Sequence, residues 1–486
     1  MKQNLQSIQP VIMWKIARDE WRYWFRSKLA VVALLIGLTC TMLTVVVSVG
    51  DAFELEHQRG HAQQQSEQTF VNQPDRHPHR MVHYGHYVFK TPPPLGMVDP
   101  GVDSHTGNTI FLEGHRQNSA TFADQKQSSG TTILGALTPA FVLQVLAPLL
   151  LVIMGYGVVS RERETQTLSI LAAQGLGYGN LILGKISALL LVAMLMLLPL
   201  AISGIVVLSQ GESLLTLSLF LVGYLLYLSI WILIIVSISL WAKSNSVSFS
   251  TLAFTWLVLC ILMPRVATTV AGVMVPAAGK LEKDFAVVAE LRQLGDGHNA
   301  KDKAFVQLEA ELLKKHKVNR VEDLPLNFRG FVALKSEAEI TSILNRYAED
   351  RMHEELRQSF FARQFGWLSP QVALRTLSML TAGTGLETHH RFLRETENLR
   401  FNFVQRLNQA HTNKLNYIDD MNRNKSEAAG QIARISAKNW NVIEGFKFRS
   451  SPSKERALQA MTPLAQLLLW FGMFGLFLRN LQRHYS

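Results

Sequence analysis

Six long apolar runs, almost free of charged side chains, constrain the fold of this chain more than any other feature. A hydrocarbon layer about 30 Å thick is crossed by roughly 20 helical residues, each of which rises about 1.5 Å. One such run could be a buried helix of a soluble protein, but six of them, several ending at Arg or Lys, favour a membrane protein. The predicted spans are residues 29–49, 136–160, 186–208, 214–240, 247–263 and 462–478.

Lysine and arginine in the short loops predict the orientation of these spans. Basic residues precede the first span, bracket the loop 161–185 after the second, and follow the last span in the tail 479–486. Because basic loop residues favour the cytoplasm, both chain ends are expected there, with the spans in a bacterial inner membrane. The segments 50–135 and 264–461 are then two periplasmic domains on the opposite face.

The net charge of +11, from 48 Lys and Arg against 37 Asp and Glu, does not indicate a nucleic-acid partner. The basic residues are spread over positions next to the membrane and both outer segments rather than gathered in one stripe. Anionic headgroups explain this distribution better, so membrane lipids are an expected partner. Both cysteines, Cys40 and Cys260, lie in predicted spans, so the outer domains are expected to fold without disulfides.

Residues 1–28 carry aromatic side chains, among them Trp14, Trp24 and Phe25, at helical spacing with cations on another face. This pattern is typical of an interfacial, or elbow, helix that lies in the headgroup plane with its aromatic rings at the boundary. The helix leads directly into the first span.

The two outer segments differ in their predicted structure. Segment 50–135, rich in Gln, His, Pro and Gly, indicates turns and short strands, with a loose connection over 117–130. In segment 264–461, a helix is expected to start at Ser369-Pro370 and to end at Gly383, and another to run over about 387–421. The expected fold class is an all-α polytopic membrane protein with six transmembrane helices, an N-terminal interfacial helix, a mixed or irregular first periplasmic domain and a mainly helical second one.

The loop between the second and third spans carries the most informative motif, Arg161-Glu162-Arg163-Glu164-Thr165-Gln166-Thr167-Leu168. The apolar residues Leu168, Ile170 and Leu171, with acids upstream, predict one short amphipathic helix that has its acids near the N-terminus. Gly175 is expected to end it. A short helix held between two spans would transmit to both of them any displacement imposed by a cytoplasmic partner.

This motif, followed by Leu183-Gly184-Lys185 at the start of a span, resembles the coupling-helix segment of type-2 ABC exporter permeases, and the helix before the first span is similar to theirs. Segments at 77–85, 99–102, 112–118 and 377–384 resemble a poorly characterised Gram-negative subgroup with two large periplasmic insertions. The resemblance implies a non-catalytic membrane subunit that pairs with a second copy or a paralogue. It also implies a separate ABC ATPase subunit, which binds ATP and Mg²⁺ and contacts Glu162, Arg163, Glu164, Thr165, Thr167 and Leu168.

Residues 179–185 match the first part of a phosphate-binding loop, but Ile186 stands where a Ser or Thr would hold Mg²⁺. No strand is predicted before this segment, and the next residues enter the membrane. ATP hydrolysis is therefore expected from a partner chain, and this chain is not expected to be an enzyme.

A histidine-rich tract lies in the first outer segment, with imidazoles at His77, His79, His83 and His86. Such tracts bind metals, and four imidazoles would suit Zn²⁺ or Cu²⁺. Their spacing is irregular and no cysteine joins them. The alternative is a loop whose histidines bond to backbone groups or water.

Three functions remain open from the sequence. The favoured one is the permease subunit of an ATP-binding cassette transporter, which exports a substrate or does conformational work in the periplasm. The second is an ATP-driven mechanotransmitter or assembly factor for a periplasmic metalloprotein or lipoprotein, with no substrate path. The third, a membrane receptor without an ATPase, requires the motif at 161–168 to be accidental. A polar cavity between the spans of two protomers would favour the first, and a sealed apolar interface the second.

Overall fold

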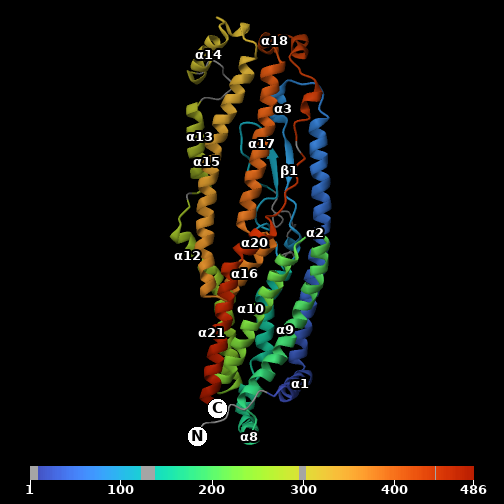
Figure 1. The fold of residues 1–486 in the computed structure, drawn as a ribbon, viewed down its shortest axis with the longest axis vertical. Helices are drawn as coiled ribbons and strands as arrows, with labels where there is room; N and C mark the ends of the chain where they lie inside the picture. Colours follow the sequence, from blue (N-terminus) through green and yellow to red (C-terminus); the bar gives the residue numbers. More distant parts are fainter. Residues whose placement is uncertain (1–8, 122–136, 278, 295–302, 444, 486) are drawn as a thin grey trace.

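The computed structural model describes residues 9–121, 137–277, 279–294, 303–443 and 445–485. The molecule is elongated, with a helix bundle at one end of its long axis and a second, mainly helical part at the other (Figure 1). Helices α1 (Pro10–Ser27) and α8 (Thr167–Ala173) and the end of α21 (Met461–Tyr485) lie at the free end of the bundle, which we call the base. The part beyond the bundle is called the distal domain.

Six helical segments of the described chain are long and apolar enough to cross a membrane. Each overlaps one of the predicted spans over most of its length, which confirms a mainly helical protein of membrane-spanning type. They are α2 (Leu29–Val71), the segment Pro139–Glu164 with α6 (Ala147–Gly155) and α7 (Ser160–Glu164), α9 (Tyr178–Ser209), α10 (Leu214–Trp241), the segment Asn245–Met274 with α11 (Asn245–Trp256) and α12 (Met263–Met274), and α21 (Met461–Tyr485).

Helix α10 forms the centre of the bundle and packs against α6, α9 and α21. Its rings Tyr224, Tyr227 and Trp231 are fully buried. The peripheral helices instead leave apolar side chains uncovered, such as Leu35 and Val46 on α2 and Leu476 on α21. Such faces suit contact with lipid, because no water has to be ordered around them there.

The N-terminal segment forms a helix, α1 (Pro10–Ser27), as predicted, and it packs mainly on α9. Trp14 and Phe25 are exposed, as a headgroup-plane helix requires. Trp24 differs from the expectation because its ring is buried and its indole N–H donates to the Met154 carbonyl, 3.1 Å away. A buried indole needs such a partner, so Trp24 is an internal contact of the base rather than a membrane anchor.

The helix that contains the first predicted span does not end at residue 49. Helix α2 continues without a break to Val71, and its 43 residues would measure about 65 Å. The expectation of turns directly after residue 50 was therefore wrong. The polar stretch after Gly50 is rich in Gln, Glu and Ala, which are good helix formers, and pairs such as Gln58 with Glu54 bond across one turn.

The remainder of the first outer segment is irregular with short elements, in agreement with the prediction. Strands β1 (His86–Phe89) and β2 (Thr109–Leu112) pair antiparallel, with His86 opposite Leu112 and Phe89 opposite Thr109. Helix α3 (Pro78–Tyr84) precedes β1. The predicted connection at 117–130 lies largely outside the described residues.

The distal domain is built around two long helices, α15 (Phe328–Gln364) and α17 (Leu386–Lys414), which pack along each other (Figure 1). Helix α17 ends seven residues earlier than predicted, because Asn416 caps a new helix, α18 (Tyr417–Asn422). The smaller helices are α13 (Lys280–Leu294), α14 (Lys303–His316), α19 (Glu427–Ile432) and α20 (Ser453–Gln459).

Helix α16 (Pro370–Ala382) has the predicted ends: Ser369 accepts a hydrogen bond from the Val372 N–H, and Gly383 is left-handed at φ 72°. Its position was not predicted. It packs against α10 and α21, and Leu374 and Leu377 belong to the same apolar core as the spans. Helix α16 therefore joins the distal domain to the centre of the bundle.

Candidate functional site

The predicted coupling segment forms two short helices rather than one. Helix α7 carries Glu162 and Glu164, and α8 carries the apolar residues. Gln166 separates them in a left-handed conformation, at φ 60°. The sequence predicted that the acids lie at the N-terminus of the apolar helix. They lie instead on the separate helix α7. Gly175, at φ 85°, follows α8 where its end was predicted.

A buried charge network holds α7 in place. Lys185 on α9 donates to Glu20 Oε2 on α1 at 2.6 Å and also pairs with Glu162 on α7. Arg161 lies 3.0 Å from the same Glu20 oxygen and stacks on the ring of Tyr23, 3.5 Å from its centroid. Glu20 and Lys185 are almost completely buried, and two cations balance two anions. The network binds α1, α7 and α9 into one unit.

The same short helix is bonded to the turn between α10 and α11. The Glu164 carboxylate accepts a hydrogen bond from the Asn245 N–H at 3.1 Å, and Arg163 donates to the Trp241 and Ala242 carbonyls. Ser160 Oγ lies 2.7 Å from Asn245 Oδ1. A displacement of α7 must therefore act on four neighbouring elements at once.

The six predicted interface residues divide between the interior and the surface. Leu168 is buried, and Glu162 and Arg163 are half-buried and occupied by the bonds above. Glu164, Thr165 and Thr167 are exposed, and Ile170 next to them is 58% exposed. The outward surface of the segment is thus α8 with the end of α7. Sequence reasoning missed Glu20, a lone acid within an aromatic-rich helix.

The near-match to a phosphate-binding loop at 179–185 is helical and belongs to α9. Its lysine, Lys185, is the central cation of the buried network. This segment therefore supplies an internal ion pair to the base.

The four predicted metal-binding histidines do not meet at one point. His77 is buried beside His411 and Asp420, whereas His79 and His83 lie beside His115. His86 is buried separately between the rings of Phe70 and Phe403.

The cluster of His77, His411 and Asp420 is enclosed. Asp420 lies 3.0 Å from His77 Nε2 and 2.7 Å from His411 Nε2, and it also pairs with Arg423 on α18. Burial opposes ionisation of Asp420, but the hydrogen bonds to His411 and His77 outweigh it and hold its pKa well below the usual range. The Arg329 guanidinium is a further 3.7 Å away. Two guanidinium groups beside one carboxylate leave little attraction for a metal ion.

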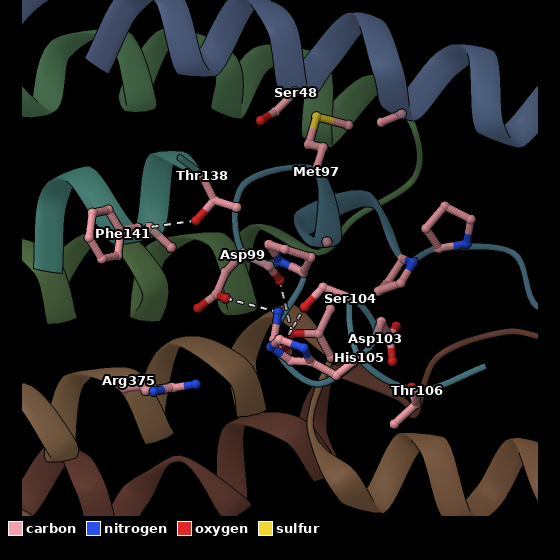
Figure 2. Close-up of a pocket in the computed structure, with 18 of the residues that line it drawn as sticks. Ser48, Met97, Asp99, Asp103, Ser104, His105, Thr106, Thr138, Phe141 and Arg375 are labelled. Atoms are coloured by element: carbon pink, nitrogen blue, oxygen red, sulfur yellow. Dashed lines mark hydrogen bonds between the residues drawn. The ribbon is translucent and has the colours of Figure 1, made fainter. Parts of the chain in front are cut away.

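A cavity of about 790 Å³ lies where the bundle meets the distal domain. Figure 2 shows Ser48 of α2 at one side, Thr138 and Phe141 at a second, and Arg375 of α16 at a third. Acidic and basic groups both line it, with Asp99 on the loop between β1 and β2. Apolar side chains such as Met97 and Phe141 line it as well, so the cavity offers both polar and apolar contacts to a ligand.

A hydrogen-bonded chain connects this cavity with the centre of the bundle. Ser378 of α16 donates to the Asp99 carboxylate and lies 3.0 Å from the Tyr224 hydroxyl of α10. Tyr224 in turn accepts from Gln144 at 2.9 Å. Burial raises the pKa of Asp99, partly offset by its bonds to Ser378 and to the Gly101 N–H. The chain fixes the cavity wall to two spans and to α16.

A family model described as a domain of unknown function, DUF3526, matches residues 284–449. The matched segment runs from α13 to the chain before α20 and includes α15, α16 and α17. A search of curated proteins gave no match. The segment is thus similar to a family whose description assigns no activity.

Proposed function

We propose that this protein is the membrane subunit of an ABC transporter, and that a separate ATPase subunit binds the exposed surface of α8. The observation that carries the proposal is the fixation of α7, which Lys185, Glu20 and Glu162 bind to α1 and α9 while α8 remains uncovered. A segment with this arrangement transmits force from its surface to several spans.

The proposal assigns the base to the cytoplasmic face of a bacterial inner membrane and the distal domain to the periplasm. The charge pattern of the short loops supports this orientation. ATP and Mg²⁺ would bind to the partner chain. A second copy of this chain or a paralogue would complete the membrane core, because six spans offer a small core by themselves.

Motion at the base has a direct route to the distal domain. Helix α10 approaches α16 so closely that a Cβ at Gly223 would lie 2.6 Å from Leu377 Cδ2. Tyr224, one residue further on, is bonded through Ser378 to Asp99 at the cavity. A shift of α10 therefore changes the cavity wall. Export of a substrate through this cavity is the first form of the proposed function.

One observation favours the second form, in which the subunit does mechanical work on a periplasmic metalloprotein or lipoprotein. Helix α2 extends from the base into the distal domain without interruption, and its last turn, at Phe70, packs in the distal core with Phe403 of α17. Rigid connections of this kind deliver displacement to the distal domain whether or not a substrate crosses the membrane.

The test is an exposed-surface substitution in α8. We expect Ile170→Asp to weaken the binding of the proposed ABC ATPase subunit and to reduce the ATP hydrolysis that this protein stimulates in lipid nanodiscs. Burial of one isoleucine is worth about 1.5 to 3 kcal/mol, so the affinity should fall by about tenfold or more.

The matched control is Ile432→Asp, because Ile432 is 63% exposed and lies at the end of α19 in the distal domain. It should leave both complex formation and ATP hydrolysis unchanged. If Ile170→Asp and Ile432→Asp behave alike, α8 is not the docking surface and the proposal fails.

A further inference from the structure

Two histidines of α3 face the same side of that helix. His79 and His83 are four residues apart, a spacing that places side chains one above the other. Their Nε2 atoms lie 3.2 Å apart, and their ring centroids 4.7 Å apart. In a tetrahedral zinc site with Zn–N bonds of about 2.0 to 2.1 Å, two nitrogen ligands are separated by roughly 3.3 Å. The pair therefore already has the spacing of two ligands of one ion.

A third histidine is brought to this pair by the loop after β2. The Gly114 N–H donates to the Val82 carbonyl of α3 at 3.0 Å. A Cβ at Gly114 would lie 2.1 Å from Val82 Cγ1, so only glycine permits this approach. As a result, the ring of His115 lies 5.3 Å from that of His83. One ring nitrogen from each of the three histidines lies within 4.8 Å of the others.

A buried carboxylate orients the third histidine. The backbone of His115 is left-handed, at φ 63°, a conformation that is uncommon outside glycine and must be held by its surroundings. Glu337 Oε2 of α15 accepts the His115 N–H at 3.0 Å and lies 2.9 Å from His115 Nδ1. Glu337 is itself buried and paired with Arg400 of α17. A carboxylate on the distal nitrogen of a histidine is the usual outer partner of a metal-bound imidazole.

The charge around the site favours a cation. Glu397 shares the Arg400 guanidinium, so two carboxylates face one arginine behind His115. His83 is exposed, whereas His79 and His115 are half-buried. An ion could enter from solvent without opening the domain.

We propose that His79, His83 and His115 form a binding site for one divalent transition-metal ion of the imidazole-preferring class, Zn²⁺ or Cu²⁺, with Glu337 as the outer partner of His115. The site lies in the distal domain, beside α17 (Figure 1). Three protein ligands leave a fourth position open, which is typical of sites that exchange or act on a ligand rather than of closed structural sites. The proposal does not depend on the docking of an ATPase to α8.

The test uses the full-length protein in detergent, purified without a histidine tag and stripped with a chelator. Zn²⁺ is titrated in competition with a chromophoric chelator. We expect one Zn²⁺ per chain. The double variant His79→Gln/His83→Gln should bind Zn²⁺ at least about 100-fold more weakly than the wild type. Glu337→Gln should have a smaller effect, a loss of affinity of roughly 10- to 100-fold. The visible spectrum of the Co²⁺-loaded protein should show the intense bands of a four-coordinate site and lose them in the double variant.

The matched control is His353→Gln, because His353 is an exposed histidine of α15 whose Nε2 lies 4.0 Å from the Glu349 carboxylate, away from the proposed site. It should bind Zn²⁺ as tightly as the wild type. Because His79 and His83 are near the surface, the double variant should keep the melting temperature of the metal-free protein, and this measurement verifies that it is folded. Equal Zn²⁺ affinity in the wild type and the double variant, or no stoichiometric Zn²⁺ binding at all, would overturn the proposal.

Discussion

One histidine cluster includes the residue that caps α3 and another includes two residues within that helix, and the two clusters use the same side chain for different purposes. At the start of α3, His77 and His411 share the buried carboxylate of Asp420, which is also paired with Arg423. Beyond it, His79, His83 and His115 face one another near the surface. Both groups satisfy the distance requirement for a metal ion.

The clusters differ in where the carboxylate lies. In the first, the carboxylate is between the imidazoles and is saturated by hydrogen bonds and guanidinium groups. In the second, Glu337 lies beside Nδ1 of His115 and not between the imidazoles. Ligand distance alone therefore does not distinguish a structural cross-link from a binding site, whereas the position of the counter-charge does.

The largest effect is expected from Asp420→Ala, which removes the centre of the first cluster. His77, His411 and Asn327 would each lose a buried hydrogen-bond partner, so we expect a loss of about 3 to 5 kcal/mol in the free energy of unfolding. Denaturant unfolding of the detergent-solubilised protein measures it. A loss below about 1 kcal/mol would show that this cluster is no cross-link.

A second effect concerns His86, the histidine that belongs to neither cluster. Its ring nitrogens find no partner among the described residues, and burial lowers its pKa from 6.5 to about 4. Between these pH values the unfolded chain binds a proton at His86 that the folded chain does not bind. The free energy of unfolding is therefore highest above about pH 6.5 and falls as the pH drops toward 4. The shift corresponds to about 3 kcal/mol at 1.36 kcal/mol per pKa unit.

We therefore expect His86→Phe to reduce the loss of stability between pH 6.5 and pH 4. Some acid sensitivity should remain, because burial, reinforced by the charge of Lys90, lowers the pKa of His389 to about 3. Unfolding curves recorded across this pH range provide the measurement. An unchanged slope in the variant would mean that His86 is protonated in the folded protein.

A smaller effect is expected from the metal itself. At a free Zn²⁺ concentration 100 times the dissociation constant, an ion that binds only the folded chain adds about 2.7 kcal/mol to stability. The melting temperature of the wild type should rise with Zn²⁺, and that of the double variant His79→Gln/His83→Gln should not. A rise in both would place the bound Zn²⁺ elsewhere, for example at the first cluster.

The smallest effect sharpens the same contrast. In the absence of metal, His83→Gln should change the free energy of unfolding by no more than about 0.5 kcal/mol, because its side chain is exposed. The difference between His83→Gln and Asp420→Ala in the free energy of unfolding would distinguish a surface ligand from an internal cross-link. A large loss in His83→Gln would remove that distinction.

The parts of the fold that could be predicted are those with local physical causes. The bilayer requires long apolar runs, so the six spans were found, and the ends of α16 followed from Ser369 and Gly383. The continuation of α2 was missed because polar composition was taken as evidence against a helix. The left-handed residue Gln166, which divides the coupling segment, gives no comparable sequence signal.

The candidate sites depend on contacts between residues far apart in the chain. Glu20 meets Lys185 across 165 positions, and His115 meets Glu337 across 222. The histidine tract contains two residues of the proposed metal site, His79 and His83, but only the fold brings His115 to them and places His77 and His86 elsewhere. Such partners follow from the packing of α1 on α9 and of the β2 loop on α3, which hydrophobic periodicity does not specify.

The unbroken length of α2 sets the scale of any movement in this protein. A stiff rod of about 65 Å that tilts by about 5° at one end carries its far tip through an arc of roughly 6 Å. That is more than one helical turn, obtained without a hinge between the two halves of the molecule. A small tilt of α2 at the base would therefore displace its far end by a distance large enough to open or close a contact there.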